Sequence, residues 1–418
     1  MIAQHKLSER HIHSLRPEST WVVAEGQHVD CGEVLARGVC FEHASATGVI
    51  TSVSGNTLIL QNTAEAQPVK QPAQMPPLDG RNSAAILRRI QEAGIVGLGG
   101  GGFPTHLKLL AAARKRVQTL VVNAVECEPG ISCDAALLKE DPTTIHSGID
   151  AVRALLELKT IHIAASDKTA FEYHSGSITV IRQPKPTDGA ERYLVERLIG
   201  EPVPVGALPV DRGVVVLNVA TLHAIGRAMQ GFPLTARVVT VFGENQWVRI
   251  GTPLAAFSDG PLVCIGGEMS GTDISTTGAT EKRTNSIQQA RHFLNLPCIR
   301  CGACDDTCPE QLPVANLVSL VAGQTQFSVR DTASGCIGCG LCNPVCPSGI
   351  DVAGLVRTLR DSQRAEVRRT YDTSRAEQRY QRHTSRMAAE ELAQAERRAS
   401  RLARLTPGGT AMSGSGDD

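Results

Sequence analysis

The sequence has few of the features that mark nucleic-acid-binding proteins. Only 3% of its 418 residues are aromatic, so it offers few flat side chains on which bases or sugars could stack. The formal net charge at pH 7 is zero, which gives no overall attraction to a polyanion. We therefore expect no nucleic-acid partner.

Long apolar runs are also missing. A membrane-spanning helix needs about 20 consecutive apolar residues, and residues 214–217 are typical of the longest run here. The first six residues carry no apolar stretch behind their basic residue, which predicts that they are not a signal peptide. We expect a chain without a transmembrane segment in a reducing compartment, where clustered thiols bind metals rather than form disulfides.

The pattern of apolar residues predicts a multidomain α/β protein. Short alternating runs over 20–62 predict a small all-β unit, and the proline-rich stretch at 67–81 predicts a linker. Strand and helix patterns then alternate up to residue 231, which predicts a mostly parallel sheet covered by helices. Residues 232–266 return to β patterning.

The last part of the chain is predicted to be helical. A helical stretch at 313–322 separates two cysteine-rich runs, and residues 353–405 read as one long helix. This helix has 13 arginines and no lysine against 7 acidic residues. Such an excess could dock on acidic protein surfaces or anionic lipid headgroups, although a solvated charged helix is the alternative. Residues 407–418 are rich in Gly, Ser and Asp and are predicted to be disordered.

Eight of the 13 cysteines form two runs with identical spacing, Cys-x-x-Cys-x-x-Cys-x-x-x-Cys-Pro. Three thiolates at this spacing surround three corners of a [4Fe–4S] cluster, and the fourth, before proline, usually ligates the other cluster. Zinc is the alternative, but it gains nothing from the third cysteine of each run. We predict that one cluster is held by Cys298, Cys301, Cys304 and Cys346. The second is predicted to be held by Cys336, Cys339, Cys342 and Cys308.

The other cysteines show no ligand spacing, and small buried thiols are the expected interpretation for all of them. They are Cys31, Cys40, Cys127, Cys133 and Cys264. Cys127 differs from the rest in its neighbours, because two glutamates, Glu126 and Glu128, flank it.

A glycine-rich loop at 97–102 packs five glycines into six residues and precedes a predicted helix. Backbone N–H groups in such a loop, together with the positive end of the helix, can hold an anion such as a phosphate. Lys108 lies one turn into that helix and could reach the same anion. A flexible turn is the alternative, and the loop does not fit the Rossmann fingerprint because a helix precedes it.

A polar segment at 122–130 follows a predicted buried strand, so it should lie at the carboxyl edge of the sheet, where α/β proteins bind ligands. It contains two neighbouring carboxylates, Glu126 and Glu128. We expect them to hydrogen-bond a ribose or a ring N–H, with a solvated turn as the alternative.

The order of these motifs resembles that in the C subunit of the Rnf electron-transport complex, a family which is itself similar to the flavin- and NADH-binding subunit of respiratory complex I. The resemblance implies FMN, NAD(H) and two [4Fe–4S] clusters as cofactors. It also implies a lipoyl-like β-sandwich at 1–66, an α/β FMN/NAD-binding domain at 82–231 and a β-grasp (SLBB-like) module at 232–284. An α-helical dicluster ferredoxin domain at 285–356 and a basic helix with its tail at 357–418 would follow.

The same resemblance assigns individual residues. The FMN phosphate would be held by Gly99, Gly100, Gly101, Gly102 and Lys108. The flavin and nicotinamide would be contacted by Asn123, Glu126, Glu128, Asn218 and Thr221.

Two segments depart from the family pattern. The family usually has Tyr-Pro-Ser-Gly-Gly-Glu where this chain reads Pro-Thr-Asp-Gly-Ala-Glu at 186–191, so Gly189 and Glu191 remain but the tyrosine is absent. Ala190 stands in place of a glycine, which bears on NAD(H) binding. Residues 267–271 read Gly-Glu-Met-Ser-Gly where the family usually has Gly-Pro-Met-Met-Gly.

The function that the resemblance implies is electron input to a membrane complex. The chain would be a peripheral subunit on the cytoplasmic face of the bacterial inner membrane, associated with other Rnf subunits. As part of an NADH:ferredoxin-type oxidoreductase, it would pass electrons between NAD(H), FMN and the clusters, with ferredoxin involved indirectly and ion translocation coupled to the redox reaction. The alternatives are a cobalamin reductase-like flavoprotein and a non-catalytic iron–sulfur wiring subunit that has lost NAD(H) binding.

Overall fold

The computed structural model of the chain describes residues 2–63, 75–78, 82–166, 173, 177–180, 185–204, 206–321 and 333–405. It forms two units, Met1–Arg357 and Thr358–Asp418. The predicted linker at 67–81, except for 75–78, and the predicted tail at 407–418 lie outside the described residues.

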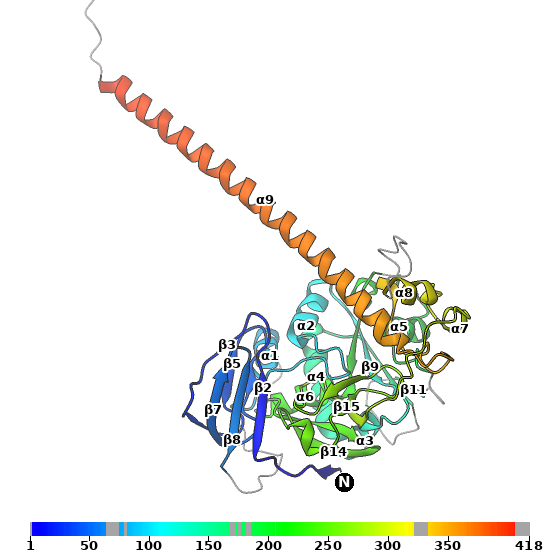
Figure 1. Cartoon of the computed structure of the whole chain (residues 1–418). Helices are drawn as coiled ribbons and strands as arrows, with labels where there is room; N and C mark the ends of the chain where they lie inside the picture. Colours follow the sequence, from blue (N-terminus) through cyan, green and yellow to red (C-terminus); the bar gives the residue numbers. More distant parts are fainter. Residues whose placement is uncertain are drawn as a thin grey trace, which may run out of the picture. The chain divides into compact units, whose positions relative to one another are not determined.

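The N-terminal part of the first unit is built of two antiparallel sheets (Figure 1). One has the order β2 (Arg10–Ser14), β8 (Thr57–Asn62), β7 (Gly48–Ser54), β4 (His28–Val29). The other consists of β3 (Thr20–Trp21), β5 (Val34–Arg37) and β6 (Glu42–His43). Apolar side chains such as Leu35, Ile50 and Leu60 fill a fully buried core. The predicted all-β unit at 20–62 is confirmed, and its first strand, β2, begins earlier in the chain.

A four-stranded sheet forms the centre of the first unit. Its order is β11 (Ser177–Val180), β10 (Thr160–Ala165), β9 (Thr119–Ala124), β12 (Val214–Asn218). Every pairing in it is parallel, which confirms the predicted sheet. Leu120, Val121 and Val122 are consecutive and all buried, so both faces of β9 are covered.

Six helices accompany this sheet along the chain. They are α1 (Ser83–Glu92), α2 (Thr105–Arg114), α3 (Cys133–Glu140), α4 (Pro142–Leu156), α5 (Glu191–Ile199) and α6 (Val219–Met229). A 3-10 turn, η1 (Pro209–Arg212), precedes β12. Helices α4 and α6 cross where each has a glycine: a Cβ on Gly148 would lie 1.9 Å from the Leu222 carbonyl oxygen, and one on Gly226 would lie 2.0 Å from that of Thr144. Only glycine permits this close approach.

A six-stranded sheet follows in the chain. Its order is β1 (Ala3–Gln4), β14 (Glu244–Arg249), β13 (Ala236–Val241), β17 (Ser286–Gln289), β15 (Leu262–Ile265), β16 (Thr272–Ser275). The turn η2 (Leu254–Ala256) lies between β14 and β15. This sheet extends past the predicted module at 232–284 at both ends, because β1 pairs with β14 and β17 pairs with both β13 and β15. Both added strands are short and polar, so their sequences carry little strand signal.

The cysteine-rich part has little regular structure. It contains α7 (Ala303–Asp306), α8 (Val314–Val321) and η3 (Ala333–Gly335). Helix α8 confirms the predicted helical stretch at 313–322, and α9 (Val352–Leu405) confirms the long helix. The first turn of α9 is anchored in the first unit by buried Val352, Ala353 and Val356. Among the helices that the structure describes, none combines the length and apolar character that crossing a bilayer requires.

Candidate functional site

Two asparagines meet at the carboxyl edge of the parallel sheet. Asn123 on β9 and Asn218 on β12 are register partners, and the Asn218 side chain accepts a hydrogen bond from the Ala220 N–H, which caps α6. Asn123 Nδ2 donates to the Gly189 carbonyl at 2.9 Å. Asn218 Nδ2 donates to Asp134 Oδ2 at 2.5 Å. The two predicted asparagines therefore fasten both the 186–191 segment and the start of α3 to the sheet edge.

The glycine loop lies over Asn218. A Cβ added to Gly99 would stand 3.2 Å from the Asn218 Cβ, whereas one added to Gly101 would meet nothing within 4 Å. Gly100 has a φ of +98°, which favours glycine. The loop is anchored from below by Thr221, whose buried hydroxyl accepts a hydrogen bond from the Leu98 N–H at 2.9 Å. Thr221, predicted to contact the flavin, thus holds the glycine loop.

The 186–191 segment accommodates Ala190 without strain but has no room for a side chain at position 189. Ala190 has φ −71° and ψ 128°, an ordinary extended backbone, so the replacement of a glycine there adds no strain. A Cβ on Gly189 would stand 2.8 Å from the Cys127 Sγ. Glu191 begins α5, and its carboxylate pairs with Lys108 Nζ at 2.6 Å. The structure brings these two predicted residues together, with the lysine held at Glu191.

A pair of carboxyl groups lies next to the asparagines. Glu126 Oε1 accepts a hydrogen bond from the Asp134 N–H at 2.8 Å. Burial, reinforced by the negative charge of Asp134, raises the pKa of Glu126 to about 8. Burial also raises the pKa of Asp134, against the opposing effects of Asn218 and buried Arg237. Sequence analysis missed Asp134, because an acidic residue in the first turn of a helix is usually only a favourable partner for the helix dipole.

Glu128 binds a loop of the six-stranded sheet. Its carboxylate accepts hydrogen bonds from the N–H groups of Met269 and Ser270, at 3.3 and 3.1 Å. The Met269 carbonyl in turn accepts from Asn343 Nδ2 at 3.1 Å, and a Cβ on Gly340 would lie 2.5 Å from the Met269 carbonyl. Residues 267–271 are therefore wedged between Glu128 and the second cysteine run. No local pattern in the sequence indicates this bridge.

The eight clustered cysteines line two separate cavities. The first is lined by Cys298, Cys301, Cys304 and Cys346. The second is lined by Cys308, Cys336, Cys339 and Cys342. Among the described residues, no three His, Cys, Asp or Glu side chains converge on one point as a single metal ion would require. Each set of four thiols surrounds a space instead.

Helix α5 connects the second cavity to the 186–191 segment. The Tyr193 hydroxyl donates to Glu310 Oε1 at 2.8 Å, and Arg192 forms an ion pair with the same carboxylate at 2.5 Å. Glu310 follows Cys308 by two residues. Burial and the hydrogen bond with Glu310 raise the pKa of Tyr193 to about 12. The second cavity is thus tied to the sheet-edge residues from two sides.

Two larger cavities border the glycine loop. One, of about 320 Å³, is lined by Gly101 and Gly102 and by Arg16 and Arg283, which are far away in sequence and which the sequence analysis missed. Arg16 donates to the Gly102 carbonyl at 2.9 Å. These two guanidinium groups bring positive charge to the loop.

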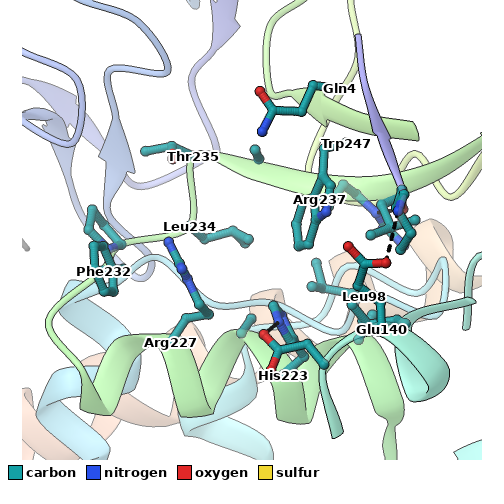
Figure 2. A pocket seen from close by; sticks show the side chains of 18 residues that line it. Gln4, Leu98, Glu140, His223, Arg227, Phe232, Leu234, Thr235, Arg237 and Trp247 are labelled. Atoms are coloured by element: carbon teal, nitrogen blue, oxygen red, sulfur yellow. Dashed lines mark hydrogen bonds and ion pairs between the residues drawn. The ribbon is translucent and has the colours of Figure 1, made fainter. Parts of the chain in front are cut away.

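The second, of about 220 Å³, lies between α6 and strands β13 and β14 (Figure 2). Leu98 and Trp247 are among its lining residues, and His223 there donates to Asp141 at 3.2 Å. This hydrogen bond lowers the pKa of Asp141. None of the predicted site residues lines this cavity, so it is separate from the sheet-edge site.

Comparisons with known proteins agree with this arrangement. Residues 90–227 match the Nuo51 FMN-binding domain family, and residues 297–350 match the 4Fe-4S dicluster domain family. A solved structure, the air-oxidized NAD+-reducing [NiFe]-hydrogenase, has 17% identity and a TM-score of 0.46, covering 69% of this chain and 64% of that one.

Three relatives are each named as the C subunit of an ion-translocating oxidoreductase complex. The protein from Edwardsiella ictaluri is 34% identical over 71% of this chain and 43% of its own length. The protein from Klebsiella pneumoniae is 32% identical over 73% of this chain and 46% of its own length. The protein from Yersinia enterocolitica is 33% identical over 76% of this chain and 52% of its own length. The chain spans about half the length of these relatives. The chain is therefore similar to the C subunits of ion-translocating oxidoreductase complexes, and it contains a region that matches the Nuo51 FMN-binding domain family followed by one that matches the 4Fe-4S dicluster domain family.

Proposed function

We propose that this chain is the electron-input subunit of an ion-translocating oxidoreductase complex, a peripheral protein on the cytoplasmic face of the bacterial inner membrane. It would exchange electrons between NAD(H) and the other subunits, with ferredoxin as an indirect partner. When bound, FMN supplies the conversion between hydride transfer and single-electron transfer, and [4Fe–4S] clusters carry single electrons. The observation that carries this proposal is the double connection between the sheet-edge site and the second cysteine cavity.

The glycine loop suits the phosphate of FMN. Gly99, Gly100 and Gly101 are exposed, and no side chain caps the N-terminus of α2, so its positive end remains available to an anion. Gly102 is flanked by Arg16 and Arg283. We propose that the four glycines bind the phosphate, with Lys108 and the two arginines supplying positive charge.

The sheet edge suits the flavin ring and nicotinamide. Asn123, Asn218 and Gly189 frame the edge, and Glu126 is mostly protonated at pH 7 because its pKa is near 8. We propose that NAD(H) binds here too, with Glu128 and Glu191 at the border. The ordinary backbone conformation at Ala190 supports the binding of NAD(H) here, since the alanine does not distort the 186–191 segment.

The cysteine cavities suit two [4Fe–4S] clusters. Thiolates are soft ligands that such clusters require, and each cavity has four. We propose that each cluster takes three cysteines from one run and the fourth from the other. Cys308 and Cys346 are then the exchanged ligands.

The two connections give the relay its order. Glu128 positions the 267–271 loop against Gly340 and Asn343 of the second cysteine run. Tyr193 and Arg192 hold Glu310 beside Cys308. We propose that the second cavity therefore receives electrons first.

We also propose the division into a lipoyl-like unit at 1–66, the FMN/NAD-binding domain at 82–231, a β-grasp module at 232–284, the dicluster domain at 285–356 and the helical end at 357–418.

Two observations favour a second candidate, an iron–sulfur subunit that passes electrons without binding NAD(H). The family's tyrosine is absent from 186–191, and Lys108 is already engaged with Glu191. Anaerobic addition of NADH to purified, cofactor-reconstituted protein separates the two. Bleaching of the flavin absorbance supports the proposal. Protein with both clusters but no bound FMN and no bleaching would establish the wiring subunit instead.

A further inference from the structure

The arginines of α9 are not spread evenly around the helix. At about 100° per residue, six of the exposed arginines whose side chains the structure describes fall within an arc of about 60°. They are Arg364, Arg375, Arg379, Arg382, Arg386 and Arg397. All six are exposed. At a rise of about 1.5 Å per residue they form a row about 50 Å long, which we call the arginine stripe.

The acidic residues of the same helix are divided between its two sides, because Asp361 falls at the edge of the stripe and Glu390 and Glu396 fall within about 40° of it. Glu366, Glu377 and Glu391 fall about opposite the stripe. Within the described part of the helix, the one ion pair at the stripe joins Arg386 to Glu390, at 4.0 Å. If the charged residues served only to keep the helix soluble, opposite charges at i,i+4 spacing along each face would stabilise the helix more. For the other five arginines of the stripe the structure shows no ion pair with a described residue, so their guanidinium groups are available to an external anion.

The apolar side chains of α9 that the structure describes beyond residue 358 do not form a second stripe. Val367, Tyr380, Met387 and Leu392 are exposed, and their helical positions are scattered rather than aligned. The helix therefore has neither the a/d seam of a coiled coil nor an apolar face that could sink among acyl chains. Its binding to a partner would be electrostatic.

We propose that the arginine stripe docks on the surface of a membrane that contains anionic lipids. A straight row of guanidinium groups about 50 Å long can be engaged throughout by a flat surface, whereas a curved protein surface meets only part of it. Lipid phosphates supply closely spaced anions, and guanidinium groups bind phosphate with paired hydrogen bonds. The choice of a membrane rests on the proposed function, which places the chain next to one.

The test uses the full-length, cofactor-loaded protein and sedimentation with lipid vesicles. One set of vesicles is pure phosphatidylcholine, and the other has one quarter of it replaced by phosphatidylglycerol. The stripe variant carries Arg375→Gln, Arg379→Gln and Arg382→Gln. The matched control carries Arg369→Gln, Arg398→Gln and Arg401→Gln, which remove the same charge outside the stripe. Circular dichroism checks that both retain the helix.

We expect the wild-type chain to bind only the anionic vesicles and to be released as salt is raised. Because each basic residue near an anionic surface contributes up to about a factor of five, the stripe variant should bind between about tenfold and 100-fold more weakly. The control should lose no more than about threefold. Equal losses in the two variants, or binding to duplex DNA but not to anionic vesicles, would overturn the docking proposal. NADH bleaching of the flavin is measured separately on the same samples, so a failed redox test and a failed docking test cannot be confused.

Discussion

The cysteine cavities and the sheet-edge site are assembled in different ways. Each cavity takes three cysteines from one short loop, and only the fourth, Cys308 or Cys346, comes from a distance. The sheet-edge site draws Gly99, Asn123, Gly189 and Asn218 from four separate segments. The ligand geometry of the cavities is thus set largely by spacing, whereas the sheet-edge site depends on the whole parallel sheet. Substitutions in a cavity should therefore abolish the binding of one cofactor, whereas substitutions at the sheet edge should lower the affinity for a cofactor gradually.

The largest effect is expected from single cysteines of the second cavity. Cys308→Ser and Cys339→Ser should each lose the same cluster, because both thiols line one cavity, and iron per chain should fall by about half. Cys298→Ser should lose the other. Iron and sulfide analysis with electron paramagnetic resonance distinguishes them. Cys40→Ser is the control, since that thiol donates to the Ile95 carbonyl, as a serine would. If Cys308→Ser removed the same signal as Cys298→Ser, the exchange of ligands would be wrong.

A methyl group at Gly189 should weaken flavin binding about tenfold. Its Cβ would press on the Cys127 Sγ at 2.8 Å, and overpacking of this kind costs ~1–3 kcal/mol. Fluorescence titration of the FMN-free protein with FMN measures the affinity. The matched change Ala190→Gly should leave the affinity for FMN unchanged. The double variant Gly189→Ala/Cys127→Ala should recover most of the wild-type affinity. Failure of the double variant to recover would show that the contact with Cys127 is not the cause.

Loss of the Glu128 carboxylate should slow electron transfer without preventing flavin reduction. Glu128→Gln weakens two hydrogen bonds to the 267–271 loop, each worth ~1 kcal/mol, so the loop should loosen against the second cysteine run. Stopped-flow absorbance after mixing with NADH should still show flavin reduction, with cluster reduction slowed relative to it by about fivefold. Glu268→Gln, at an exposed position in the same loop, is the control. Equal rates in both variants would remove the loop from the relay.

The smallest effect is a change in pH dependence. Because the pKa of Glu126 is raised from 4.5 to about 8 in the folded chain, the folded state holds more protons than the unfolded state between these values. Stability should therefore fall as pH rises through this window. In Glu126→Gln the fall should be smaller, by an amount on the order of 1 kcal/mol, as read from urea unfolding at several pH values. The exposed Glu196→Gln should retain the wild-type slope. An unchanged slope in Glu126→Gln would contradict the raised pKa.

Local patterns predicted much of the fold. The predicted helix after the glycine loop coincides with α2, and the apolar run at 214–217 lies in β12, because a buried apolar run and a Pro-Thr boundary are strong local signals. The partner of Asn123 could also be anticipated, since parallel strands end at the same edge. Strand β1 could not, because two residues acquire strand structure only through pairing with β14.

Contacts between distant segments account for what could not be predicted. Glu310 carries no signal that it will bind Tyr193, and Met269 none that it will contact Asn343, since both contacts arise from the packing of separate segments. Arg16 meets Gly102 for the same reason. These contacts connect the sheet-edge site to its neighbours. The types of residue in the site could therefore be predicted from the sequence, but the contacts between them could not.

The most direct measurement of the proposed relay is rapid mixing of the reconstituted chain with NADH under anaerobic conditions, followed by absorbance and freeze-quench electron paramagnetic resonance. We predict that flavin bleaching comes first and that the cluster removed by Cys339→Ser is reduced next, before the cluster removed by Cys298→Ser. Reduction of the Cys298 cluster first, or cluster reduction without flavin bleaching, would contradict the relay.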